Sequence, residues 1–89
     1  MEHYERRMLA VSMAGHDRGK VYMIWKEEND FVFLVDGEQR PLAKPKKKNR
    51  RHMQVVKKIP DEWKNLPLQS ITDEKIKHVL KCYNKEKEL

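Results

Sequence analysis

Three short apolar runs separated by polar turns constrain the fold of this 89-residue chain more than any other feature. The runs cover residues 8–13, 21–26 and 31–35, and the second and third are rich in β-branched and aromatic side chains, which favour strands. Two glycines, Gly15 and Gly19, lie between the first two runs and suit a tight turn. The pattern therefore predicts three strands joined by turns.

The next segments extend this prediction to a small sheet. Residues 27–30 are predicted as a polar turn, and residues 40–43 as a short fourth strand that Pro41 confines to an edge or a strand end. Residues 44–49 are predicted as a basic loop and residues 52–56 as a closing strand. Several short strands within 60 residues indicate a mainly β fold, a small, partly open SH3-like barrel.

A helix is expected to follow the barrel. The predicted organisation is a barrel over residues 1–58, a linker over residues 59–72 with one short helical turn after Pro60, and a helix over residues 73–89 capped by Thr72. The apolar stripe of this helix consists of Ile76, Val79, Leu80 and Tyr83. We expect the stripe to pack on the barrel, because a domain this small needs the extra burial.

Aromatic residues are assigned mainly to the core. Trp25, Phe31 and Phe33 lie within apolar strands, so we predict that they are buried, with base stacking as the alternative. Tyr22 fits either role. Trp63, which lies outside the barrel pattern, is predicted to cover the open edge of the barrel.

The positive charge is concentrated in one segment. The net charge of the chain is +6, and residues 40–60 contain nine Lys or Arg and no Asp or Glu, whereas the flanking segments are neutral or acidic. An anionic partner would offset the self-repulsion of such a segment. Nucleic acid is the first candidate and an anionic membrane the second, but residues 40–60 do not form an amphipathic helix, which argues against the membrane.

The residue pattern favours a binding protein over an enzyme. The sequence has no recognisable Ser/His/Asp or Cys/His arrangement, phosphate-cradling glycine-rich loop or paired catalytic carboxylates. His78 and Cys82 share a helix face, but a structural zinc ion needs four ligands, so we expect neither a metal nor another cofactor. With one cysteine and no signal-peptide pattern, we expect a cytoplasmic protein, and we expect it to be a monomer.

Residues 11–20, Val-Ser-Met-Ala-Gly-His-Asp-Arg-Gly-Lys, resemble the KOW motif, a strand–turn–strand element of ribosomal and transcription-elongation proteins. The Asp36-Gly37 turn, the basic segment at residues 42–53 and the helix start at residues 72–76 resemble one branch of this family. That branch includes the "fourteen-e" large-subunit ribosomal proteins and small bacterial KOW-domain proteins. The family often has a basic residue at the position of His16.

The resemblance implies a KOW-type barrel that docks on ribosomal or other structured RNA through a basic loop at residues 40–58, with ribosomal proteins as further candidate partners. The candidate RNA-binding residues are Arg18, Lys20, Arg40, Lys44, Lys46, Lys47, Lys48, Arg50, Arg51 and His52. The alternative is a protein-interaction module that uses the barrel edge or the apolar stripe of the helix.

The chain differs from the family pattern at the first strand. The family usually has a glycine near the start of this strand, where this chain has Arg7 and Met8.

Overall fold

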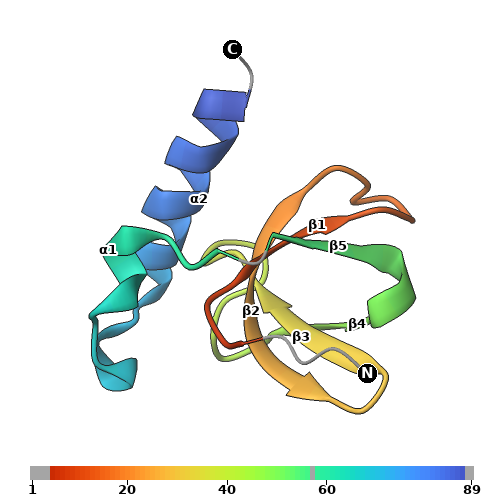
Figure 1. The fold of residues 1–89 in the computed structure, drawn as a ribbon, viewed down its shortest axis with the longest axis horizontal. Helices are drawn as coiled ribbons and strands as arrows, with labels where there is room; N and C mark the ends of the chain where they lie inside the picture. The colour runs from red at the N-terminus through yellow and green to blue at the C-terminus, as the bar shows by residue number, and fades with distance from the viewer. Residues whose placement is uncertain (1–4, 57, 88–89) are drawn as a thin grey trace.

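Five antiparallel strands form one sheet in the order β4-β3-β2-β1-β5 (Figure 1). This computed structural model describes residues 5–56 and 58–87, with the side chains of the last helix described to residue 83. The strands are β1 (Leu9–Ser12), β2 (Val21–Glu28), β3 (Phe31–Val35), β4 (Lys46–Asn49) and β5 (Met53–Val56). A short 3-10 turn, η1 (Arg50–His52), joins the two edge strands β4 and β5. The pairings found among the described residues do not join β4 to β5, so they leave the sheet open.

The three apolar runs form β1, β2 and β3, as the sequence predicts. The bounds of β3 agree with the prediction, whereas β2 continues through Glu27 and Glu28, which were expected in a turn. The hairpin turn consists of Asn29 and Asp30, because Glu28 already pairs with Phe31. Asn29 has a φ of 52°, a left-handed conformation that suits a two-residue hairpin turn.

The prediction for the basic segment is wrong in its local structure. Residues 40–43 form a turn and not a strand, with the Lys44 N–H donating to the Pro41 carbonyl at 2.9 Å. Residues 46–49, expected in a loop, form strand β4 and pair with β3. Buried β3 carries main-chain groups on both sides that need hydrogen-bond partners, and this need outweighs the low strand propensity of lysine.

Three helical segments follow the sheet: the short α1 (Asp61–Lys64) and η2 (Leu68–Ser70), and the longer α2 (Asp73–Lys87). Helix α1 confirms the helical turn predicted after Pro60. Thr72 caps α2 as predicted, since its hydroxyl accepts from the Lys75 N–H at 3.3 Å. Among the described residues, no helix combines the length and the apolar character needed to cross a membrane.

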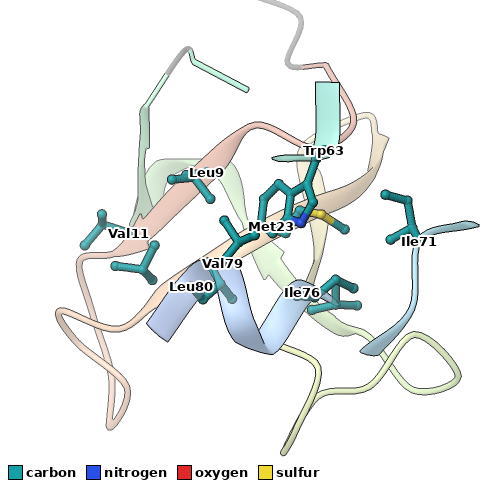
Figure 2. Packing of buried hydrophobic residues seen from close by; sticks show 10 residues of the cluster. Leu9, Val11, Met23, Trp63, Ile71, Ile76, Val79 and Leu80 are labelled. Carbon is teal, nitrogen blue, oxygen red and sulfur yellow. The ribbon is translucent and has the colours of Figure 1, made fainter. Parts of the chain in front are cut away.

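Helix α2 packs on one face of the sheet, which confirms the predicted role of its apolar stripe (Figures 1 and 2). Ile76, Val79 and Leu80 are buried in one cluster, and Tyr83 packs against it half-buried. Trp63 is fully buried within the same cluster, against which Val56 of the edge strand β5 also packs (Figure 2). A second cluster fills the opposite face of the sheet and consists of Ala10, Tyr22, Ile24, Val32, Leu34 and Met53.

The loop after β3 fixes the position of α2. Gly37 has a φ of 78°, and a Cβ atom built there would lie 2.2 Å from the Asp73 carbonyl oxygen. Asp73 also accepts a hydrogen bond from the Leu42 N–H at 2.8 Å through its side chain. The first turn of α2 is therefore in direct contact with the loop, and a glycine at residue 37 makes this close approach possible.

Candidate nucleic-acid interface

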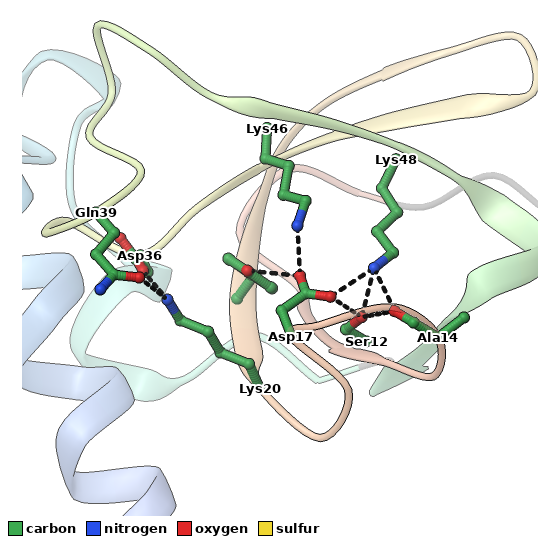
Figure 3. A network of polar contacts seen from close by, with 9 residues as sticks. Ser12, Ala14, Asp17, Lys20, Asp36, Gln39, Lys46 and Lys48 are labelled. Carbon is green, nitrogen blue, oxygen red and sulfur yellow. Dashed lines mark hydrogen bonds and ion pairs between the residues drawn. The ribbon is translucent and has the colours of Figure 1, made fainter.

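The turn between β1 and β2 places an aspartate beneath the edge strand β4. Gly15 and Gly19 have φ values of 86° and 89°, which confirms that they are turn residues. The turn is closed by Gly19 N–H donating to the Ser12 carbonyl at 2.7 Å and by Ser12 N–H donating to the Lys20 carbonyl at 3.0 Å. Asp17 is thereby directed toward the lysines of β4 (Figure 3).

Asp17 is the centre of a polar network that joins the turn to β2 and β4. Lys46 Nζ lies 2.8 Å from one carboxylate oxygen and Lys48 Nζ lies 2.7 Å from the other (Figure 3). The hydroxyls of Ser12 and Tyr22 donate to the same carboxylate at 2.8 Å and 2.7 Å. Four side chains from three segments thus satisfy one carboxylate.

The network changes the acidity of its members. Burial raises the pKa of Asp17, but hydrogen bonds from Lys46, Lys48, Tyr22 and Ser12 outweigh burial and hold that pKa well below its usual range. Burial and the hydrogen bond to Asp17 raise the pKa of the Tyr22 hydroxyl above its ordinary value. Asp17 is therefore a carboxylate and Tyr22 a neutral donor at neutral pH.

Lys48 belongs to this network and not to the exposed surface. Its side chain is 9% exposed. Its ammonium group lies 2.6 Å from Ser12 Oγ, 2.8 Å from the Ala14 carbonyl oxygen and 2.7 Å from Asp17 Oδ1. An ammonium group has three donors, and these three acceptors use them all. Although Lys48 is a candidate RNA-binding residue by sequence, it holds the turn against β4.

A second polar network lies just before the start of β2. Lys20 Nζ is 2.6 Å from Asp36 Oδ2 and 3.2 Å from the side-chain oxygen of Gln39 (Figure 3). The other Asp36 oxygen accepts from the N–H groups of Glu38 and Arg40 at 2.9 Å and 2.8 Å. Burial raises the pKa of Asp36, but Lys20 and the two N–H groups lower it below its usual value.

The two networks border one polar pocket of about 290 Å³. The pocket is lined by His16, Asp17, Lys20, Tyr22, Gln39, Arg40 and Lys46. Three of the candidate RNA-binding cations, Lys20, Arg40 and Lys46, thus line this pocket from three separate segments. They outnumber the two carboxylates, Asp17 and Asp36, so the pocket region carries net positive charge.

Three further candidate residues, Arg50, Arg51 and His52, lie at the opposite end of β4, about 10 Å along the strand. Arg50 forms an ion pair with Glu27 at 2.6 Å, and its N–H donates to the Asp30 carbonyl at 2.9 Å. Arg51 and His52 are exposed on η1. The basic segment therefore does not form one cluster but runs along an edge of the sheet.

Exposed cations follow this edge. Side chains alternate along a strand, so Lys47 points away from Asp17 and is exposed while Lys46 and Lys48 point toward it. Lys44 and Arg18 are also exposed. In the described part of the chain, no ion pair is found for the side chains of Arg18, Lys44, Lys47 and Arg51. These four cations are open to an external anion.

The aromatic residues of β2 and β3 differ from the prediction. Phe31 and Phe33 are half-buried and belong to neither core cluster, and Trp25 is half-buried at the margin of the first cluster. The alternation of β3 explains this, because Val32 and Leu34 take the buried face and leave the two phenylalanines on the other. An uninterrupted apolar run hid this two-residue period in the sequence.

Residues 11–20 form the end of β1 and the turn around Asp17, and they end at Lys20, the residue before β2. The arrangement thus keeps a carboxylate inside the turn and directs exposed cations outward along β4. Arg7 has a φ of 82°, a left-handed conformation that favours glycine. Comparison with protein-family models and with curated proteins finds no match to this chain.

Proposed function

We propose that this protein binds structured RNA through contacts between its exposed cations and RNA phosphates. The observation that supports this most directly is the distribution of charge: Lys44, Lys47 and Arg51 are exposed along the β4 edge, and Lys20, Arg40 and Lys46 border one pocket beside it. Lys and Arg bind phosphate oxygens without reading sequence, and the release of counterions contributes to affinity. The resemblance to KOW proteins makes ribosomal RNA the first RNA to test.

We further propose that the five-stranded sheet is an SH3-like barrel of the KOW type. The strand order, the short η1 connection between β4 and β5, and the glycine-bounded turn around Asp17 support this. In such a barrel the Asp17 network holds the β1–β2 turn against β4, and so fixes the positions of the exposed cations. Fixed cations lose less conformational entropy on binding than cations on a mobile loop.

A protein-interaction role has less support from the same observations. The apolar stripe of α2, one of its two candidate surfaces, is covered by the sheet. The other candidate is the sheet edge, which β4 and β5 form. At β4 this edge carries exposed Lys47 and comes directly after exposed Lys44, and lysines on an edge disfavour the addition of a further strand. An anionic partner suits this edge better than a β-strand does.

The test is a pair of matched charge reversals measured by RNA titration. The variant Lys47→Glu/Arg51→Glu alters exposed residues of the β4 edge, and Lys64→Glu/Lys81→Glu alters exposed residues of α1 and α2. Both variants lower the net charge equally. We expect the first to weaken binding to ribosomal RNA fragments by about tenfold or more and the second to leave it nearly unchanged. Equal losses, or no loss in either, would count against this interface.

A further inference from the structure

Three aromatic side chains lie on the sheet face that also carries α2: Trp25 packs at the margin of the cluster that the helix covers, and Phe31 and Phe33 lie outside that cluster. We call Trp25, Phe33 and Phe31 the aromatic strip. Residues paired directly across antiparallel strands share a face. The register pairs Phe33 with Lys26 on one side and with Lys47 on the other. Trp25 lies at the β-bulge between Ile24 and Lys26 and packs against the cluster on the same sheet face. The strip therefore runs from β2 to β3, and Lys47 of the exposed β4 edge lies beside it.

A cation lies over each ring of the aromatic strip. The distances from the charged group to the ring centroid are 5.1 Å for Arg6 over Trp25, 5.7 Å for Lys26 over Phe33 and 4.3 Å for Lys47 over Phe31. Lys26 also lies 3.3 Å from Glu28, so the strip has three cations and one neighbouring carboxylate. The strip thus combines flat apolar surface with net positive charge.

The packing of the core does not account for the two phenylalanines. Helix α2 covers Met23 and Val35 at the other end of this sheet face, whereas Phe31 and Phe33 lie outside both core clusters. Lys26 and Lys47, which lie over these rings, are exposed. Exposed lysine side chains are flexible, and their cation–π contacts are weak. Moving them off the rings therefore costs little free energy.

We propose that the aromatic strip stacks unpaired RNA bases, so that the RNA element bound is a loop or bulge beside a helix. This inference rests on the proposed RNA-binding function and names the part of the RNA involved. Stacking of a base on an aromatic ring is stronger than an exposed cation–π contact. A base therefore replaces the ammonium group over Phe31 or Phe33, and the displaced lysine binds the phosphate of the same strand.

Unpaired nucleotides suit the strip better than paired ones do. A base within a duplex has both faces covered by its neighbours, whereas bases in loops and bulges can be splayed out and stacked on protein rings. The phosphates of such a segment would lie near Lys47 and continue toward the exposed cations of the β4 edge. Charge and ring geometry therefore favour the same occupant.

Two RNAs test the inference: a blunt-ended duplex, and the same duplex interrupted by a bulge of uridines. We expect the protein to bind the bulged RNA about tenfold more tightly for each stacked base. Phe31→Leu/Phe33→Leu keeps apolar side chains but removes the rings, so it should bind both RNAs with the affinity of the original protein for the duplex. Tyr83→Leu, which removes a half-buried ring on α2, is the matched control and should keep the preference.

A second measurement does not depend on the double variant. Titration with a uridine oligomer should quench the fluorescence of Trp25, whereas Trp63 is fully buried and out of reach. Quenching should be lost in Trp25→Phe. Equal affinity of the original protein for the two RNAs, or a loss of affinity for both RNAs in the double variant, overturns the stacking inference and leaves the proposed function standing. Failure of the original protein to bind either RNA overturns both.

Discussion

The role of Asp17 as the centre of a largely buried ion-pair network could not be predicted from its position in the sequence. A turn between two glycines predicts an aspartate that bonds its own backbone. Instead its carboxylate binds Lys46 and Lys48, which are 29 and 31 residues away. Pairing over such separations depends on the sheet register, and the sequence prediction of a basic loop placed no strand there. Counting charges thus identified the basic segment but not which of its lysines face inward.

Asp17→Asn should destabilise the protein strongly. Removing one partner of a largely buried ion pair leaves the other charges uncompensated, and here two ammonium groups lose their common carboxylate. We expect the free energy of unfolding at neutral pH to fall by about 3 kcal/mol or more. Denaturant titration measures this loss. Asp30→Asn, in the exposed β2–β3 turn, is the control and should change stability by less than about 0.5 kcal/mol.

The pH dependence of this loss follows from the direction of the pKa shift. The folded-state pKa of Asp17 lies below the unfolded value of about 4, so its contribution is complete above that value and disappears as the pH falls through the folded-state pKa. The difference in unfolding free energy between the original protein and Asp17→Asn should be constant from about pH 5 to about pH 7 and shrink below about pH 4. A difference that stays constant in acid would contradict the role of Asp17.

At the scale of elements, the apolar runs were sufficient to predict β1, β2 and β3, whereas β4 was missed. Three consecutive lysines show no alternation of apolar and polar residues, so the sequence does not indicate a strand there. The strand forms because its main chain pairs with β3 and its lysines form ion pairs with Asp17. The helix was predictable from its own stripe and its Thr72 cap. Its docking through the loop at Gly37 was not predictable, because that contact depends on the fold as a whole.

Gly37→Ala tests how α2 is held on the sheet. An alanine Cβ would meet the Asp73 carbonyl oxygen at 2.2 Å and the Lys77 N at 2.9 Å, and both are main-chain atoms that cannot rotate away. The loop must therefore move off the helix, in addition to the cost of a positive φ at a non-glycine residue. We expect a loss of about 2–4 kcal/mol, measured by thermal or denaturant unfolding.

Gly19→Ala provides the control for this prediction. Gly19 has a similar φ of 89°, but a Cβ atom built there meets nothing within 4 Å. Its substitution should cost only the conformational term, about 1–2 kcal/mol. The difference between the two variants isolates the contact between the loop and α2, and equal losses would show that this contact does not matter for stability.

For the molecule as a whole, composition indicates a basic protein, but the structure divides its charge into two classes. Lys20, Lys46, Lys48 and Arg50 are in ion pairs within the sheet and its turns, whereas Lys44, Lys47 and Arg51 are exposed. A sequence count of nine Lys or Arg in residues 40–60 therefore overstates the charge open to a partner. One of the nine, Lys57, lies outside the described residues.

This division sets the expected salt dependence of RNA binding. Cations that already form an ion pair with a carboxylate release fewer counterions on binding than exposed cations do. We therefore count four contacts with RNA phosphates, by Arg18, Lys44, Lys47 and Arg51. At roughly 0.7–0.9 per contact, the plot of log affinity against log salt should have a slope of about −3. Titrations at several salt concentrations measure it, and Lys47→Glu/Arg51→Glu should reduce its magnitude by about half. A slope near zero would contradict the electrostatic interface, whereas a slope steeper than about −6 would mean that the lysines paired with Asp17 and Asp36 are released to the RNA.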